Sequence, residues 1–316
     1  MGIARAALII MLGNALSRIL GMVREIVIAG IFGDTSVTDA FTAASRVPTT
    51  VYDLLIGGMI AAALIPVFSD YFSEELKEEL GRLVSALLTL VGAALAVVVA
   101  ILYFIAPWAM GIFGYGYSPE VQALASGLLQ VMAPSLLFMG LAAVFTAFLY
   151  SRRSFTFPAF CAAAYNVGII LAALTLHSSM GVAGLAVGVL LGSILQVAVQ
   201  VPALRGMSLS FRFDLHHPAI GKIIKLYAPV ALGLVVSTVG VAIDTNLASR
   251  TGEGGLASMR FATTLVQFPL GLVATAMTSA ILPTLSRYGP SVLAGPERRD
   301  LGGYKTYLAL GLKMVL

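Results

Sequence analysis

The sequence predicts an all-α, polytopic membrane protein, and three observations support this fold class. Of its 316 residues, 59% are hydrophobic and only 11% are charged, whereas soluble domains average about 25% charged residues. The mean hydropathy is +0.96. Apolar residues also gather in long runs, such as Val84–Met110, Leu124–Tyr150 and Val182–Val201, and each run is near or above the ~20 residues that a helix needs to cross the hydrocarbon core. Helices are expected because no water satisfies open backbone groups there.

Eight hydrophobic stretches are long enough to be complete membrane spans. They cover approximately residues 3–32, 38–68, 83–111, 121–150, 157–177, 181–204, 221–249 and 256–286. A ninth begins near Tyr304 and stops at Leu316. The first stretch is interpreted as a retained span and not as a signal peptide, because Arg18 and Arg24 interrupt the apolar run and no small-residue cleavage site follows.

The distribution of basic residues predicts the orientation of these spans. One set of connections, together with the N-terminal Arg5, holds thirteen basic residues: Arg5, Lys77, Arg82, Arg152, Arg153, Arg205, Arg212, Lys222, Lys225, Arg287, Arg298, Arg299 and Lys305. The opposite loops hold Arg250, with Arg260 just inside the next span. By the positive-inside rule, the N-terminus is cytoplasmic. The basic pI of 9.2 therefore reflects topology, and nucleic acid is not an expected partner.

A short internal repeat predicts two halves. The sequence LIPVFSDY at 64–71 matches ILPTLSRY at 281–288, and six predicted spans separate the two copies. An even number of spans keeps the copies in the same orientation, which is typical of transporters with two parallel repeats and a binding site between them. We therefore predict an N-lobe of six helices at 1–206 and an interfacial linker at 207–220. The remainder, 221–316, is predicted to be an incomplete C-lobe with two full helices and the start of a third.

The first two spans carry unusual charges. At 100° per residue, Arg18 and Glu25 lie on one flank of the first helix, with Arg24 in a neighbouring row. In the second span, Asp39, Arg46 and Asp53 recur every seven residues. Intramembrane charges almost always face a bundle interior or a wet cavity. A functional cavity is one interpretation and a lattice of structural ion pairs is the other, because the signs balance.

Arginine and aspartate suggest different ligands for such a cavity. The rigid guanidinium fork of arginine suits phosphate better than the point charge of lysine. In the seventh span Asp244 stands in an apolar run beside Thr245 and Asn246, and these oxygen ligands suit a sodium or proton site. An isolated aspartate that bonds a neighbouring helix is the alternative.

Other motifs give no sign of an enzyme or a metal centre. Cys161 is the only cysteine, and the adjacent His216 and His217 do not share a helix face. The glycines of span six predict close helix packing: Gly181, Gly184, Gly188 and Gly192. No phosphate-binding glycine loop or nucleophile–base arrangement is found in a credible context, so we expect neither enzymatic activity nor a cofactor.

Several segments resemble the MurJ (MviN) family of lipid II flippases in the MOP superfamily. They are SRILGMVREIVIAGIFG, TDAFTAASRVP, GGMIAAALIPVFSDY, DTNLAS and FPLGLVATAMTSAILPTLSRY. The resemblance covers nearly the whole chain. It implies a fourteen-helix fold in which two six-helix lobes enclose a V-shaped cavity, so this chain would be divergent and truncated after the eighth helix. It also implies alternating-access transport of the undecaprenyl-pyrophosphate-linked peptidoglycan precursor across the bacterial cytoplasmic membrane.

The resemblance assigns roles to individual residues. Arg18 and Arg24 match essential first-helix arginines, and Glu25 matches the acidic residue that orients the second of them. Arg46 matches a basic position in helix two, and Asp39 matches the aspartate of TDAF. We therefore expect Arg18, Arg24 and Arg46 to bind the pyrophosphate and Glu25, Asp39 and Asp53 to act in coupling or gating.

The remaining assignments concern ions and departures from the family pattern. Asp244 matches an aspartate that is associated with sodium in some members, so Na⁺ or H⁺ coupling, or the membrane potential, is expected to drive transport. Tyr52 and Asp53 stand where the family commonly has an arginine, as do Thr263 and Thr264. Arg260, one turn earlier, is expected to bind substrate in place of the missing arginine.

Alternative functions remain at this point. They are export of another lipid-linked oligosaccharide, multidrug antiport within the same superfamily, and a non-transporting scaffold. The expected partners are the lipid-linked pyrophosphate substrate, membrane lipids and cell-wall synthesis proteins.

Overall fold

The fold is an antiparallel assembly of long helices. The structure is a computed structural model, which describes residues 3–71, 77–113, 116–205 and 217–288. These described residues form helices and no strand, which confirms the predicted fold class. Five of their helices are long and apolar enough to cross a membrane, or six if a bent pair is counted as one span.

The first two spans form a hairpin. α1 (Ile3–Phe32) is one continuous helix, and Gly33 turns the chain with a φ of +67° before α2 (Ser36–Tyr52) begins. Two π-helical segments, η1 (Asp53–Gly57) and η2 (Ile60–Leu64), continue α2 into α3 (Ile65–Asp70). Together they make a single stretch of 35 residues, Ser36–Asp70, that matches the second predicted span.

The next helices follow the predicted ranges, with one bend and one break. α4 spans Lys77–Phe113, α5 spans Pro119–Met132 and α6 spans Ser135–Ser151. The axes of α5 and α6 differ by 41°, because Pro134 between them lacks an N–H group and its ring crowds the preceding turn. The fifth predicted span is divided at Phe160 into α7 (Thr156–Ala159) and α8 (Cys161–Met180).

The last helices complete the set. α9 (Ala183–Gln200) ends in the 3₁₀ turn η3 (Val201–Leu204), α10 spans Pro218–Ala248 and α11 spans Gly255–Tyr288. Most of the predicted linker and the ninth stretch near Tyr304 lie outside the described residues. α10 begins at Pro218, within the last residues of the predicted linker 207–220.

Close packing of α8 on α9 explains the glycines of span six. A Cβ atom added at Gly192 would lie 2.5 Å from the Tyr165 carbonyl oxygen, and one at Gly188 would lie 2.8 Å from Ala172 Cβ. Gly184 is equally tight against Leu176. The packing prediction is wrong for Gly181, where an added Cβ would meet no atom within 4 Å outside its own chain neighbours, and which ends α8 with a φ of +56°.

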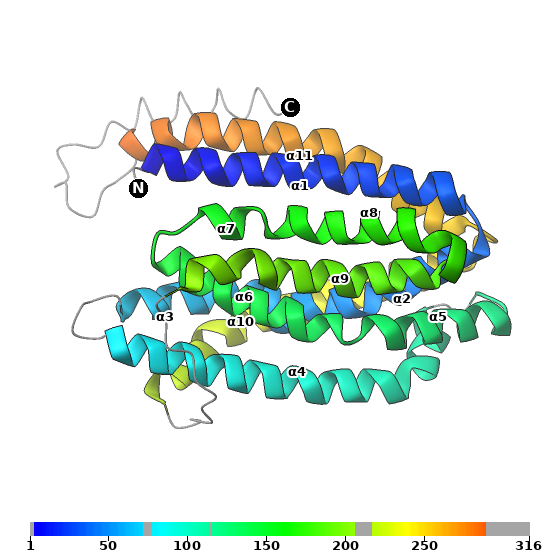
Figure 1. The fold of residues 1–316 in the computed structure, drawn as a ribbon, viewed down its shortest axis with the longest axis horizontal. Helices are drawn as coiled ribbons and strands as arrows, with labels where there is room; N and C mark the ends of the chain where they lie inside the picture. Colours follow the sequence, from blue (N-terminus) through cyan, green and yellow to red (C-terminus); the bar gives the residue numbers. More distant parts are fainter. Residues whose placement is uncertain (1–2, 72–76, 114–115, 206–216, 289–316) are drawn as a thin grey trace.

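The helices come together so that α1 lies between two partners. Figure 1 shows α1 and α11 side by side along their length, with α8 on the other side of α1 and α9 beyond it. α2 lies against α5 and also contacts α11 and α10. The arrangement therefore brings the charged faces of α1 and α2 to the boundary with α11.

Candidate functional site

A cavity of about 420 Å³ lies where α1, α2, α8, α9 and α11 meet. Its charged lining consists of Arg24, Glu25, Arg46 and Arg260. Hydroxyl and amide groups contribute the rest of the polar wall: Thr42, Ser45, Thr49, Tyr165, Thr263, Thr264 and Gln267. Three arginines against one glutamate leave an excess of positive charge, so the cavity is suited to an anion.

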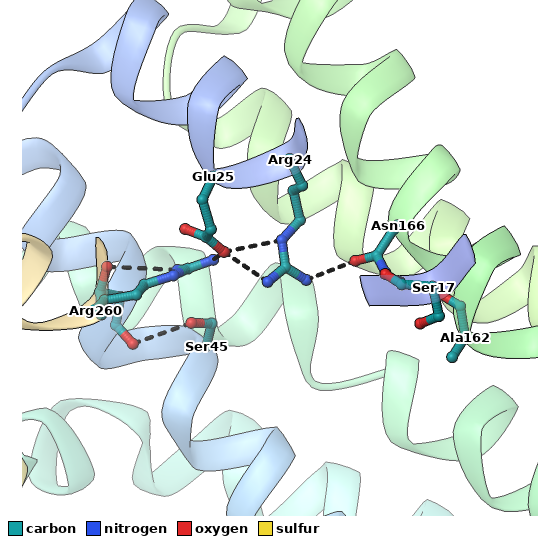
Figure 2. Close-up of polar contacts among 8 residues, drawn as sticks. Ser17, Arg24, Glu25, Ser45, Ala162, Asn166 and Arg260 are labelled. Atoms are coloured by element: carbon teal, nitrogen blue, oxygen red, sulfur yellow. Dashed lines mark hydrogen bonds and ion pairs between the residues drawn. The ribbon is translucent and has the colours of Figure 1, made fainter. Parts of the chain in front are cut away.

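Glu25 is the centre of the charged cluster. Its Oε1 atom accepts from Arg24 Nη2 at 2.6 Å and from Arg24 Nε at 3.0 Å. The same oxygen accepts from Arg260 Nη2 at 2.9 Å. Figure 2 shows the two guanidinium groups approaching the carboxylate from opposite sides. One carboxylate thus links α1 to α11.

The second oxygen of Glu25 has no hydrogen-bond partner among the residues that the structure describes. The side chain is 5% exposed, and its Oε2 atom makes no hydrogen bond among the described residues. A buried carboxylate oxygen without a donor costs free energy. The pairing in this cluster is therefore incomplete, and the arginines are oriented by Glu25 without being fully neutralised.

Asn166 of α8 fixes the orientation of Arg24. Its Oδ1 atom accepts from Arg24 Nη1 at 2.9 Å, and its Nδ2 atom donates to the carbonyl oxygens of Ser17 and Ala162, both at 3.1 Å. Figure 2 shows this chain of contacts from α1 to α8. The side chain is buried and its amide is held at both ends, so it positions the guanidinium group of Arg24.

The other two arginines of the cavity differ in their surroundings. Arg260 stacks on Phe41, with the guanidinium carbon 5.1 Å from the ring centroid, and its Nη1 atom is 3.5 Å from the hydroxyl of Thr42. Arg46 is half-buried and makes no hydrogen bond or ion pair within the part of the chain that the structure describes. Arg46 is therefore the cavity cation most available to a ligand.

Not every predicted site residue lies at this cavity. Arg24, Glu25, Arg46 and Arg260 line it, whereas Arg18 does not. The guanidinium group of Arg18 instead lies against Gly271 of α11, so close that a Cβ at that glycine would overlap it.

Asp39 caps a helix away from the cavity. This buried carboxylate accepts from the backbone N–H groups of Gly254, at 2.8 Å, and Ala257, at 2.7 Å, at the start of α11. The positive end of a helix dipole stabilises a carboxylate in that position.

Two further contacts join the α1–α2 turn to the α10–α11 turn. The hydroxyl of Ser258 donates to Asp34, and the Ser36 N–H group donates to Glu253 at 3.3 Å. A Cβ at Gly254, whose φ is +78°, would lie 2.6 Å from Asp34. Together with Asp39, these contacts fasten α2 to α11 at the end that the orientation prediction places outside the cell.

The opposite end of α10 is also fastened. Lys222 forms an exposed ion pair with Asp70 at 2.5 Å. His217 caps α10 by accepting from the Ala219 N–H group at 3.2 Å, and its Nε2 atom is 3.5 Å from Glu79. The cavity therefore lies between two sets of ties that join the α10–α11 segment to the preceding helices.

Asp244 and Asp53 lie apart from the arginine cluster. Asp244 is exposed on α10, while its neighbour Asn246 donates to the Ile112 carbonyl oxygen at 2.7 Å. Asp53 begins η1 and lines a second cavity between η1 and α10.

Sequence reasoning missed Asn166 and Tyr165. Neither residue stands in a charged motif, and an asparagine or tyrosine in an apolar helix is commonly a packing residue. A helical projection of α8 would place Asn166 on one face with Ala162 and Ala173, but only the tertiary structure shows that this face meets Arg24.

Comparisons with known proteins point to one family. The sequence profile described as lipid II flippase MurJ matches residues 28–291. The lipid II flippase MurJ of Burkholderia cenocepacia is 30% identical over 297 residues, which are 91% of this chain and 58% of that protein. The probable lipid II flippase MurJ of Vibrio cholerae is 30% identical over 298 residues, 90% of this chain and 56% of that protein.

Solved structures agree on the fold. A structure described as lipid II flippase MurJ in an inward closed conformation has a TM-score of 0.80 at 24% identity, covering 98% of this chain and 62% of that one. An inward-facing multidrug resistance MATE transporter of the MOP superfamily has a TM-score of 0.60 at 12% identity, covering 99% and 67%. The chain spans somewhat over half the length of the curated relatives it matches.

Proposed function

This chain belongs to the lipid II flippase MurJ family, and we propose that it moves a lipid-linked diphosphate saccharide of the lipid II class across the bacterial cytoplasmic membrane. The family is one of transporters and not of enzymes. The observation that carries the proposal is the excess of arginine in a cavity at the boundary between the α10–α11 segment and the preceding helices. Arginine binds phosphate oxygens through paired, charge-assisted hydrogen bonds.

The geometry suggests how the cargo is bound. Arg46 has no partner among the described side chains, and Arg24 and Arg260 share a single glutamate oxygen. A diphosphate that enters the cavity competes with Glu25 for these two guanidinium groups. Binding of the cargo thereby weakens a contact that joins α1 to α11.

The same exchange links binding to movement. In the present structure, Asp39 and Asp34 hold the α11 end at one side, and Asp70 holds α10 at the other. We propose that loss of the Glu25 contacts loosens α11 and that one set of ties opens while the other stays closed. This order of opening and closing is alternating access. The predicted cytoplasmic N-terminus defines which set of ties faces the cytoplasm.

Ion coupling is a second part of the proposal. Asp244, with the neighbouring Asn246, is the proposed site for a coupling Na⁺ or H⁺, and the membrane potential is the alternative driving force. Arg18 is proposed to act at the α1–α11 contact, where it meets Gly271.

Genetic rescue tests the proposed function. We expect the full chain to restore growth to bacteria depleted of their own lipid II flippase, and we expect the Arg24→Ala variant to fail at equal membrane abundance. Arg82→Ala is the matched control, because it removes one positive charge from an exposed ion pair with Glu78 within α4, outside the cavity and its ties. Full rescue by Arg24→Ala would show that the assigned role is wrong.

A further inference from the structure

A second cavity lies where η1 packs against α10. It has a volume of about 250 Å³ and is bounded by the end of α2, η1 and the middle of α10. Its polar lining consists of one carboxylate, from Asp53, and three hydroxyls, from Thr50, Ser237 and Thr238. It shares no lining residue with the arginine cavity.

Among the described residues, Asp53 is the only charged group of this lining. In the part of the chain that the structure describes, no lysine, arginine or histidine lines the cavity. The Asp53 side chain is exposed, and within the described ranges its carboxylate makes no hydrogen bond or ion pair. It stands 17 residues into a 35-residue span, so it is placed near the middle of the membrane. An ionisable residue at that depth indicates a functional site by default and calls for a partner.

The local backbone is shaped around this cavity. η1 begins at Asp53, and π-helical turns are rare and frequently occur at functional sites. Gly57 and Gly58 complete the wall: a Cβ at Gly57 would lie 3.2 Å from Asp53 Oδ1, and one at Gly58 would lie 2.8 Å from Leu234. The Tyr227 hydroxyl donates to the Leu54 carbonyl oxygen, which fastens α10 beside the opening.

From this geometry we propose that Asp53, Thr50, Ser237 and Thr238 form a binding site for one singly charged cation. Carboxylate and hydroxyl oxygens are ligands of hard cations. The single negative charge is neutralised by a single positive charge, which favours a monovalent ion over a divalent one. The volume holds several waters at about 30 Å³ each, so the ligand is a partly hydrated alkali-metal ion or a primary ammonium group on an organic molecule.

This site goes beyond the proposed transport of a lipid-linked diphosphate and does not depend on it. The arginine cavity selects negative charge, whereas the Asp53 cavity selects positive charge. Because its walls come from both η1 and α10, a bound cation bridges the two segments. Occupancy is therefore expected to stabilise their contact.

Thermal unfolding of the purified full chain, at constant ionic strength, tests the site. N-methyl-D-glucamine chloride is replaced stepwise by sodium, potassium or ethylammonium chloride. Ligand binding to the folded state raises the Tm, so we expect a saturable rise with at least one of the three cations. A response to sodium or potassium identifies an alkali-metal ion, and a response to ethylammonium alone identifies an organic ammonium group.

Two aspartate variants decide where the cation binds. Asp53→Asn should raise the half-saturating cation concentration about tenfold or more, since it removes a charge-assisted contact. Asp244→Asn tests whether the cation binds instead at the residue proposed for coupling. Glu120→Gln, which removes an exposed carboxylate on α5, is the control and should leave the half-saturating concentration unchanged. If Asp53→Asn does not yield folded protein, the double variant Ser237→Ala with Thr238→Val should weaken binding in the same direction.

Three results would overturn the proposal. They are a Tm that no cation raises above its value in N-methyl-D-glucamine, an Asp53→Asn or Ser237→Ala/Thr238→Val variant that responds as the unsubstituted chain does, and a response lost only in Asp244→Asn. These outcomes are independent of growth rescue, so failure of the cation site and failure of the transport proposal are distinguishable.

Discussion

At the scale of single residues, Glu25 decides the properties of the arginine cavity. Its Oε1 atom receives three hydrogen bonds from two arginines, while its buried Oε2 atom receives none from the described residues. The two guanidinium groups are thus held in place but share one negative charge. An arrangement of this kind orients the cations in the cavity and leaves them available to a stronger anion.

The variant Glu25→Gln tests this balance. Removal of one member of a buried ion pair typically costs about 3–5 kcal/mol, because the remaining charge is left uncompensated. We therefore expect Glu25→Gln to lower the Tm of the purified protein. We also expect inorganic diphosphate to raise the Tm of the variant more than that of the unsubstituted chain. Equal shifts would show that Glu25 does not compete with anions for the arginines.

Asp39 is a single residue whose hydrogen bonds hold the start of a whole helix, α11. Because it accepts from two N–H groups at the start of α11, Asp39→Ala should cost about 1–2 kcal/mol, the usual cost of losing an N-cap. A cysteine introduced at Ser258 should then react faster with a water-soluble maleimide. Leu12→Ala, an exposed position on α1, is the control that should not change this rate, and an unchanged rate in Asp39→Ala would refute the capping role.

At the scale of helices, much of the structure follows from the sequence. The apolar runs correspond to the helical ranges because each run must satisfy its own backbone hydrogen bonds in the membrane. The bend at Pro134 follows from its missing N–H group. The π-helical turns that begin at Asp53 could not be predicted, since they depend on how α2 fits against α10 and not on local propensity.

The candidate site was only partly predictable for a similar reason. A charged residue in an apolar span costs free energy and so calls for an explanation. Arg24, Glu25 and Arg46 could therefore be identified from the sequence. Which of them meet depends on the rotation of each helix in the bundle. That rotation places Arg260 on Glu25 and Arg18 against Gly271. Asn166 carries no charge and so gave no signal.

The packing of α8 on α9 gives a prediction at this scale. Gly192→Ala should destabilise the protein by about 1–3 kcal/mol, the usual cost of overpacking, because the new Cβ would lie 2.5 Å from the Tyr165 carbonyl oxygen. Gly127→Ala on α5 is the control: no atom lies within 4 Å of its Cβ position, so helix propensity should make it neutral or stabilising by up to about 1 kcal/mol. Chemical or thermal unfolding in detergent measures both, and equal stability of the two variants would contradict the predicted contact.

At the scale of the whole molecule, the charged residues form a cavity for binding and, at either end of it, contacts that hold the helices together. The arginine cavity lies between the ties at Asp39 and Asp34 and the tie at Asp70. These contacts link the α10–α11 segment to the preceding helices at both ends. A transporter needs such a boundary, with contacts at each end that form and break in alternation while the binding groups stay between them.

The central claim is that the arginine cavity binds the diphosphate of a lipid-linked saccharide, and equilibrium binding to the purified chain tests it most directly. Native mass spectrometry would follow titration with a polyprenyl diphosphate lipid and with the matching uncharged polyprenol. The account predicts binding of the diphosphate lipid alone. Arg24→Ala and Arg260→Ala should each weaken it at least tenfold, since a charge-assisted hydrogen bond contributes about 1.5–3 kcal/mol, and Arg82→Ala, at an exposed ion pair within α4, should not. Equal affinities for all three variants, or equal binding of the uncharged lipid, would contradict the claim.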